Sequence, residues 1–180
     1  MALIDHIDST YFILDVNIPD SDYSDLDVYM GKYMPEILRK LLGYELAAYV
    51  LLYDPVTSPT RIKEFVEGVE YEIDDFTVRW NGLINDDLIS LVAYYVYYWY
   101  TRNKAQNLQA TGMMALQSEN ALPASPTIKL VNAWSRMIEL YGYSGQDSYF
   151  GSAYNFLLEH DDDYPEWIFT HLETVNTWGI

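Results

Sequence analysis

The most informative pattern of hydrophobic and polar positions in this chain lies in residues 83–103, LINDDLISLVAYYVYYWYTRN. From Leu88 to Tyr100 there is no charged residue, and apolar or aromatic side chains would point in every direction around a helix. A helix on a protein surface normally has one apolar face and one polar face. We therefore predict a central helix that is covered on all sides, either by its own chain or by neighbouring copies.

The same periodicity predicts helices before and after this segment. From Pro35 to about Tyr53 the apolar residues recur at spacings of three and four, which indicates an amphipathic helix. Ser24 is the predicted N-cap of a preceding helix, with Asp25 and Asp27 in its first turn, and Pro35 is expected to kink or restart the helix.

Short signals place the remaining helix ends. Thr60 to Val66 is predicted as a short helix ended by Gly68, and Asn85 as the N-cap of the central helix, with Asp86 and Asp87 in its first turn. Further helices are expected from Ser125-Pro126 to a stop at Gly142–Gly145, and from Ser148 to His160.

Strand patterns are few. Val69–Ile73 and Phe76–Trp80 alternate around Asp74-Asp75, which predicts a β-hairpin. Tyr11–Leu14 could be a strand or an extended arm, and Thr111–Gln117 an extended segment that pairs with a neighbouring subunit.

These elements predict a mainly α-helical fold: a bundle of four to six helices around the central aromatic helix, with a small β-hairpin and a long extended loop. At 180 residues one domain, 1–180, is expected. It would carry an acidic N-terminal arm (about 1–22), a long loop (about 103–124) and a docking C-terminal tail (about 161–180).

Charge narrows the choice of partner. The net charge is −17, and no Lys or Arg precedes Lys32 or follows Arg136. Like charge repels nucleic-acid phosphates and anionic membranes. The segments richest in carboxylates are therefore predicted to form an acidic channel lining or rim, or only a soluble surface; they comprise Asp20, Asp22, Asp25, Asp27, Asp161, Asp162 and Asp163.

Composition also bears on location. The chain has no cysteine, which excludes disulfides and thiolate metal sites. The N-terminus lacks the basic and long apolar regions of a signal peptide, and the 13 residues from Leu88 to Tyr100 would span only about 20 Å of a bilayer core about 30 Å thick. We expect that the protein does not associate with a membrane and that it is synthesised in the cytoplasm.

No pattern in the sequence points to catalysis. Asp20, Asp22 and Ser24 resemble the start of a calcium loop, but the sixth and twelfth positions hold Asp25 and Gly31 instead of Gly and Glu. His160 beside the Asp161–Asp163 run could be a metal or acid–base cluster, although a helix C-terminus favours a histidine without any function. Nucleotide-binding and nucleophile-elbow motifs are absent, so we expect no enzyme and no cofactor.

Several phrases together resemble one group of viral proteins. They are PEILRKLLGYELAAY, FVEGVEY, VRWNGLINDDLISLVAYYVYYWYTRN, TGMMALQSENALPASPTIKLVNAW and the final NTWGI. From about residue 33 onward the chain is similar to small structural proteins of tailed phages that infect Bacteroides-type gut bacteria, including the crAss-like group. Those proteins look like head-to-tail connectors, or adaptors, of the phage neck.

The resemblance implies a virion protein that is assembled in the host cytoplasm. It implies a homo-oligomeric ring, usually of about twelve copies, that lies beneath the portal protein, continues the channel for double-stranded DNA and docks the tail or the next neck protein. Candidate subunit or partner contacts are Tyr94, Tyr97, Tyr98, Met113, Met114, Leu116, Trp167, Phe169, Trp178 and Ile180.

Two other interpretations stay open. The chain could be a tail-terminator or tail-completion protein on the other side of the neck. From a different class, it could be an acidic inhibitor that imitates the phosphates of DNA, in which case it would bind a basic enzyme more weakly as salt rises.

Overall fold

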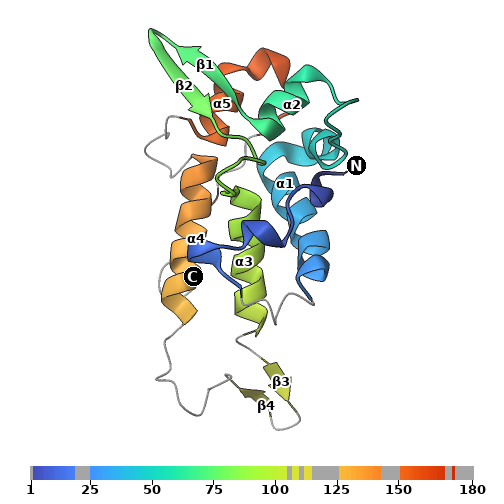
Figure 1. The fold of residues 1–180 in the computed structure, drawn as a ribbon, viewed down its shortest axis with the longest axis vertical. Coiled ribbons are helices and arrows are strands. Elements are labelled where there is room, and N and C mark those ends of the chain that lie inside the picture. Colours follow the sequence, from blue (N-terminus) through green and yellow to red (C-terminus); the bar gives the residue numbers. More distant parts are fainter. Residues whose placement is uncertain are drawn as a thin grey trace.

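Five α-helices and two small hairpins make up the described part of the chain in the computed structural model (Figure 1). The structure describes residues 2–18, 25–104, 107–109, 112–114, 126–142, 151–168 and 172. The helices are α1 (Leu26–Leu51), α2 (Thr60–Glu67), α3 (Leu91–Lys104), α4 (Pro126–Tyr141) and α5 (Ala153–Glu159). The strands are β1 (Val69–Ile73), β2 (Phe76–Trp80), β3 (Asn107–Gln109) and β4 (Gly112–Met114). This confirms the predicted mainly helical fold with a small β-hairpin.

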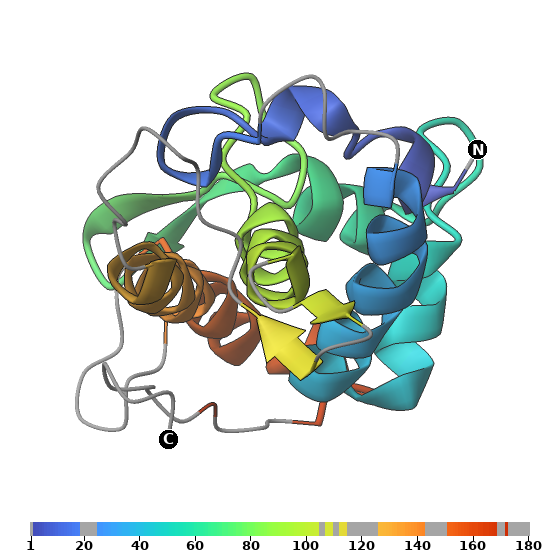
Figure 2. The ribbon, with the colours of Figure 1, turned by 90° about the horizontal axis from the view of Figure 1, so that it is seen from below.

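The aromatic helix α3 lies between α1 and α4, as Figures 1 and 2 both show. Every side chain from Leu91 to Tyr98 is buried. Its faces are covered by α1, by α4 and by the N-terminal segment. The helix was predicted to be covered by its own chain or by neighbouring copies, and its own chain is sufficient.

The N-terminal segment packs on its own chain as short 3-10 turns, and the predicted strand or extended arm is wrong. The turns are Leu3–Asp5, Ser9–Tyr11 and Leu14–Val16. Leu3, Ile7 and Phe12 are fully buried, and the segment runs across one side of the bundle (Figure 2). These apolar positions do not alternate with the period of two that a half-buried strand requires.

Helix α1 is interrupted at Gly43 and not at Pro35. Helical geometry continues through Pro35. The carbonyl that loses its helical donor there belongs to Gly31, which is exposed and can bond to water. Gly43 has φ +79° and ψ 171°, a combination that is essentially restricted to glycine.

The interruption at Gly43 leaves main-chain carbonyls without helical donors, and side chains and backbone from distant segments bond to them. The Leu41 carbonyl accepts hydrogen bonds from the Tyr141 hydroxyl at 3.3 Å and from Trp167 Nε1 at 3.2 Å. The Leu42 carbonyl accepts one from the Ile168 amide at 3.3 Å. The helix break therefore joins α1, α4 and residues 167–168.

Helices α3 and α5 begin later than predicted. Asn85 does not cap α3; its side chain bonds both backbone groups of Ile89, at 3.1 and 2.7 Å, and closes a turn before the helix starts at Leu91. Helix α5 starts at Ala153, where the Ser152 hydroxyl accepts from the Asn155 amide. Asn85 therefore stabilises a local turn that precedes α3, whereas Ser152 is the N-cap of α5 itself.

The first hairpin, β1–β2, has the predicted bounds and turn, with Ile73 opposite Phe76 and Val69 opposite Trp80. At its base Trp80 donates from Nε1 to the Phe65 carbonyl at 2.8 Å and packs with the Phe65 ring. This anchors the hairpin on α2, and its turn projects from one end of the bundle (Figure 1).

The long loop contains a second hairpin. Within the predicted extended segment Thr111–Gln117, residues 112–114 form β4, which pairs with β3 of the same chain. Thr111 and residues 115–117 lie outside the described residues. The described strand pairing is therefore within one subunit, whereas a neighbouring subunit was predicted.

Two glycines of α1 offer a matched test of the helix break. We expect Gly43→Ala to lower the free energy of unfolding by about 1–3 kcal/mol, because alanine strains this conformation and its Cβ would lie 3.2 Å from Ile168 Cβ. Gly31→Ala is the control: its Cβ meets nothing within 4 Å, and the free energy of unfolding should rise by about 0.5–1 kcal/mol. Urea unfolding measures both; equal effects would contradict the assignment of the break to Gly43.

Candidate assembly surface

The three tyrosines that were predicted as subunit contacts on α3 are buried inside their own chain. Tyr94, Tyr97 and Tyr98 are at most 6% exposed. The Tyr98 ring packs against Trp134 of α4 at 4.9 Å between centroids. A neighbouring copy cannot reach side chains covered in this way, so this part of the contact prediction is corrected.

The described part of the C-terminal tail docks on its own subunit. Trp167 is partly buried, bonds to the Leu41 carbonyl and packs against Tyr154 with a centroid distance of 5.6 Å. Phe169, Trp178 and Ile180 lie outside the described residues, as does Leu116, and the side chains of Met113 and Met114 are not described.

The predicted acidic residues fall into two groups in the described chain. Asp25 forms an ion pair with Lys104 at 2.6 Å, which connects the start of α1 to the end of α3. Asp27 and Asp161–Asp163 are exposed. Asp20 and Asp22 lie outside the described residues.

Most basic side chains are already engaged. Five of the ten form ion pairs, namely Lys40, Arg61, Arg79, Lys104 and Arg136. Arg39 and Arg102 lie over aromatic rings, and Lys32 donates to the Tyr33 hydroxyl. The surface is therefore poor in cations that could hold a phosphate backbone.

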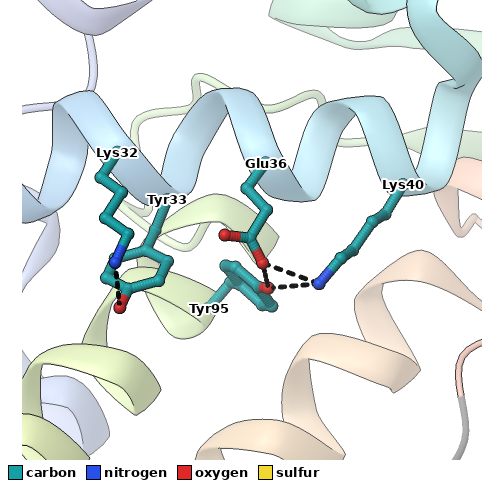
Figure 3. A network of polar contacts seen from close by, with 5 residues as sticks. All are labelled: Lys32, Tyr33, Glu36, Lys40 and Tyr95. Carbon is teal, nitrogen blue, oxygen red and sulfur yellow. Dashed lines mark hydrogen bonds and ion pairs between the residues drawn. The ribbon is translucent and has the colours of Figure 1, made fainter.

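A polar network connects α1 to α3 through a buried tyrosine (Figure 3). Tyr95, which is 1% exposed, donates its hydroxyl to Glu36 Oε1 at 2.6 Å and accepts from Lys40 Nζ at 3.0 Å. Lys40 also pairs with Glu36 at 2.7 Å. Burial opposes ionisation of Glu36, but the bonds from Lys40 and Tyr95 prevail and lower its pKa.

A second network holds residues 163–166 on α2. Arg61 binds both carboxylate oxygens of Glu166, each at 2.7 Å, and the Asp163 carbonyl at 2.7 Å. The Tyr164 hydroxyl donates to the Arg61 carbonyl. The bond from Arg61 lowers the pKa of Glu166, and burial raises the pKa of Tyr164.

Burial acts on other tyrosines in the same direction. It raises the pKa of Tyr71 to about 12 and also raises the pKa of Tyr94 and of Tyr95. Removing an ionisable hydroxyl from water disfavours the charged phenolate. These hydroxyls therefore stay protonated at neutral pH, and that of Tyr95 donates to Glu36.

No catalytic arrangement emerges among the described side chains. His160 bonds through Nδ1 to the Phe156 carbonyl at 2.8 Å and packs between Phe156 and Tyr71. In the described ranges, no three His, Cys, Asp or Glu residues lie close enough together to hold a metal ion. Asp20, Asp22 and Ser24, which resemble the start of a calcium loop, lie outside the described residues.

Two hollows lie beside α4. One, of about 480 Å³, lies between the segment from Trp80 to Leu91 and residues of α4. The other, of about 580 Å³, lies between Leu14–Asp15 and α4. Arg136 and Glu139 line both and pair with each other at 2.8 Å, so their charges are mutually compensated.

Two exposed apolar features were not predicted. The α1 stripe consists of Tyr44 and Ala48 of α1, Leu52 at its C-terminal cap and Val56 in the turn that follows, and all four are exposed. The hairpin tip consists of Asp74, Asp75 and Phe76. The spacing of the stripe is visible in the sequence, but apolar residues also occupy the opposite side of α1, so periodicity alone could not show which side is buried.

None of the helices in the part of the chain that the structure describes is long and apolar enough to cross a membrane. No family model, curated protein or solved structure matches this chain.

The Tyr95 network predicts a measurable loss of stability when the Tyr95 hydroxyl is removed. We expect Tyr95→Phe to lower the free energy of unfolding by about 1.5–3 kcal/mol, because its hydroxyl bonds to two charged groups in a buried position. Tyr44→Phe is the control, since Tyr44 is 79% exposed, and should have almost no effect. Chemical denaturation of both variants gives the comparison; a neutral Tyr95→Phe would contradict the assigned role.

The Arg61–Glu166 pair predicts a dependence on acid. Because the folded-state pKa of Glu166 is below its usual 4.5, its contribution is fully present above about pH 4.5 and is lost as the pH falls through the folded-state value. Glu166→Gln should therefore be less stable near pH 7 and lose less stability on acidification. Urea midpoints between about pH 3 and pH 7 test this, with Glu159→Gln, an exposed position in the same region, as the control. Parallel curves for Glu166→Gln and the unchanged protein would contradict it.

Proposed function

We propose that this chain is a structural virion protein: a head-to-tail connector, or adaptor, that forms a ring below the portal of a tailed phage. In this function it continues the DNA channel and docks the tail or next neck protein, without catalysis. The sequence resemblance from about residue 33 onward motivates the proposal. The structural observation that carries it is a self-contained helical subunit whose surface combines unpaired carboxylates with isolated apolar features.

The charge arrangement suits passage of DNA. Exposed carboxylates outnumber the basic side chains, and half of those bases are paired with carboxylates of the same chain. Such a surface repels phosphates at distances within about 10 Å at ordinary ionic strength. DNA can therefore slide past the ring without being held.

The closed core suits a subunit that folds before it assembles. The tyrosines of α3 are covered by their own chain, so α3 presents no exposed aromatic face that would have to be hidden at once. The subunit can then fold first and assemble when it meets the portal, through smaller exposed features such as the α1 stripe and the hairpin tip.

The proposal predicts association with a portal ring. Purified protein mixed with the portal of the phage that encodes it should co-sediment, and native mass measurement should give roughly one copy for each portal subunit, as ring symmetry requires. Bulk double-stranded DNA without portal is the control and should retain little protein at physiological salt. If immunolabelling of virions finds no protein at the neck, the proposal is contradicted.

The same measurements distinguish the DNA-mimic alternative. A mimic would stay monomeric or dimeric, ignore the portal, and bind a basic enzyme with an affinity that falls as salt rises. That outcome would replace the connector function.

A further inference from the structure

The α1 stripe is exposed to a degree that is unusual for apolar side chains of this size. Tyr44, Leu52 and Val56 are 79%, 73% and 82% exposed. Several large exposed apolar side chains near one helix end, with polar neighbours, are typical of an interaction site. No element of the described chain covers it.

Basic side chains flank both ends of the stripe. The Arg39 guanidinium lies 5.9 Å from the centre of the Tyr44 ring. Lys63 Nζ donates to the Val56 carbonyl at 3.3 Å. Neither base forms an ion pair within the described residues, although this chain has many more carboxylates than bases. The stripe therefore favours a partner with an apolar group beside negative charge.

The tip of the first hairpin has that chemistry. Phe76 is 71% exposed, and the turn before it holds Asp74 and Asp75, which form no hydrogen bond or ion pair within the described chain. The hairpin is fixed at its base, since Trp80 is buried and bonds to Phe65. The tip is thus an aromatic ring beside two carboxylates on a supported projection.

The two features face different sides of the molecule. In Figures 1 and 2 the turn of the β1–β2 hairpin and the turn that follows α1 lie on opposite sides. A tip cannot reach the stripe of its own subunit in this fold. A contact between two different surfaces of identical subunits is heterologous, and it produces a closed ring when the rotation closes.

We propose that neighbouring copies of this chain contact each other head to tail, with the hairpin tip of one copy seated on the α1 stripe of the next. Phe76 packs against Leu52 and Val56, while Asp74 and Asp75 lie near Lys63. This contact would join the subunits of the proposed connector ring, and its closure into a ring rests on that proposed function. The contact itself can be tested on the isolated chain.

The absence of native cysteine makes cross-linking specific. The variant Val56→Cys with Phe76→Cys places one thiol in the stripe and one at the tip, and any disulfide between them joins two copies. Mild oxidation should give a ladder of oligomers that ends in a closed species. Each single variant can form only like-with-like dimers, and a head-to-tail contact requires the ladder to form faster than these dimers.

Val28→Cys with Phe76→Cys is the matched control, because Val28 is also an exposed valine, at 71%, but lies near the start of α1 and outside the stripe. The ladder should form about two- to five-fold faster for the stripe pair, since Asp74 and Asp75 still meet Lys63 in these variants and an exposed ion pair contributes about that factor. Equal rates for the two pairs, or no ladder for the stripe pair in free protein and in any oligomer it forms, would overturn the proposal.

Charge exchange provides a second test in the same assay. With the cysteine pair present, Lys63→Glu should slow cross-linking by about two- to five-fold, the range for an exposed ion pair. Adding Asp75→Lys should restore the rate. Lys129→Glu, the same change on α4, should leave it unaltered. If Lys63→Glu and Lys129→Glu act alike, net charge explains the effect and the assigned pairing is wrong.

The result is separable from the connector function. Ladder formation without portal association would keep the head-to-tail contact and remove the connector assignment. Portal association with no preference for the stripe pair would keep the connector and remove this contact.

Discussion

The break in α1 at Gly43 is the constraint on which the arrangement of the subunit depends. A continuous helix would satisfy its own carbonyls; this one leaves those of Leu41 and Leu42 to be satisfied by Tyr141, Trp167 and Ile168. A buried carbonyl without a donor costs about 1–3 kcal/mol. The position of α4 and of residues 167–168 is therefore set by hydrogen bonds to one short stretch of α1 as well as by apolar packing. Because these donors come from segments about a hundred residues away, they unite distant parts of the chain.

Tyrosine in place of phenylalanine explains how a helix with few polar residues connects to charged neighbours. The Tyr95 hydroxyl bonds to Glu36 and Lys40, and the Tyr98 hydroxyl accepts from Arg102. Each ring supplies buried apolar area while its hydroxyl reaches the edge of the helix interface. The same bonds occupy basic side chains, so the packing of the core contributes to the acidity of the surface. The use of tyrosine on this helix therefore affects both the packing of the core and the charge of the surface.

The sequence was sufficient to predict the elements that depend on local chemistry. Gly68 ends α2, Pro126 begins α4, and Asp74-Asp75 forms the turn of the first hairpin, because caps and turns are determined by the residues that occupy them. It was insufficient where a choice depended on distant partners. Asn85 has the features of an N-cap, yet it closes an earlier turn; Pro35 has the features of a break, yet Gly43 provides it. The side of α1 that faces solvent depends on where α3 and Trp167 pack, which no local pattern states. For the same reason the stripe and the hairpin tip were missed as candidate contacts.

The buried tyrosines have a further consequence at high pH. Their folded-state pKa values, such as that of Tyr71 at about 12, lie above the usual 10. The unfolded chain therefore releases phenolic protons first, and the stability that these residues contribute is fully present below about pH 10 and is lost as the pH rises through the folded-state values. A phenylalanine core of the same shape would have no such limit. A subunit of this kind is thus sensitive to alkali through the buried tyrosines of β1 and of the central helix α3.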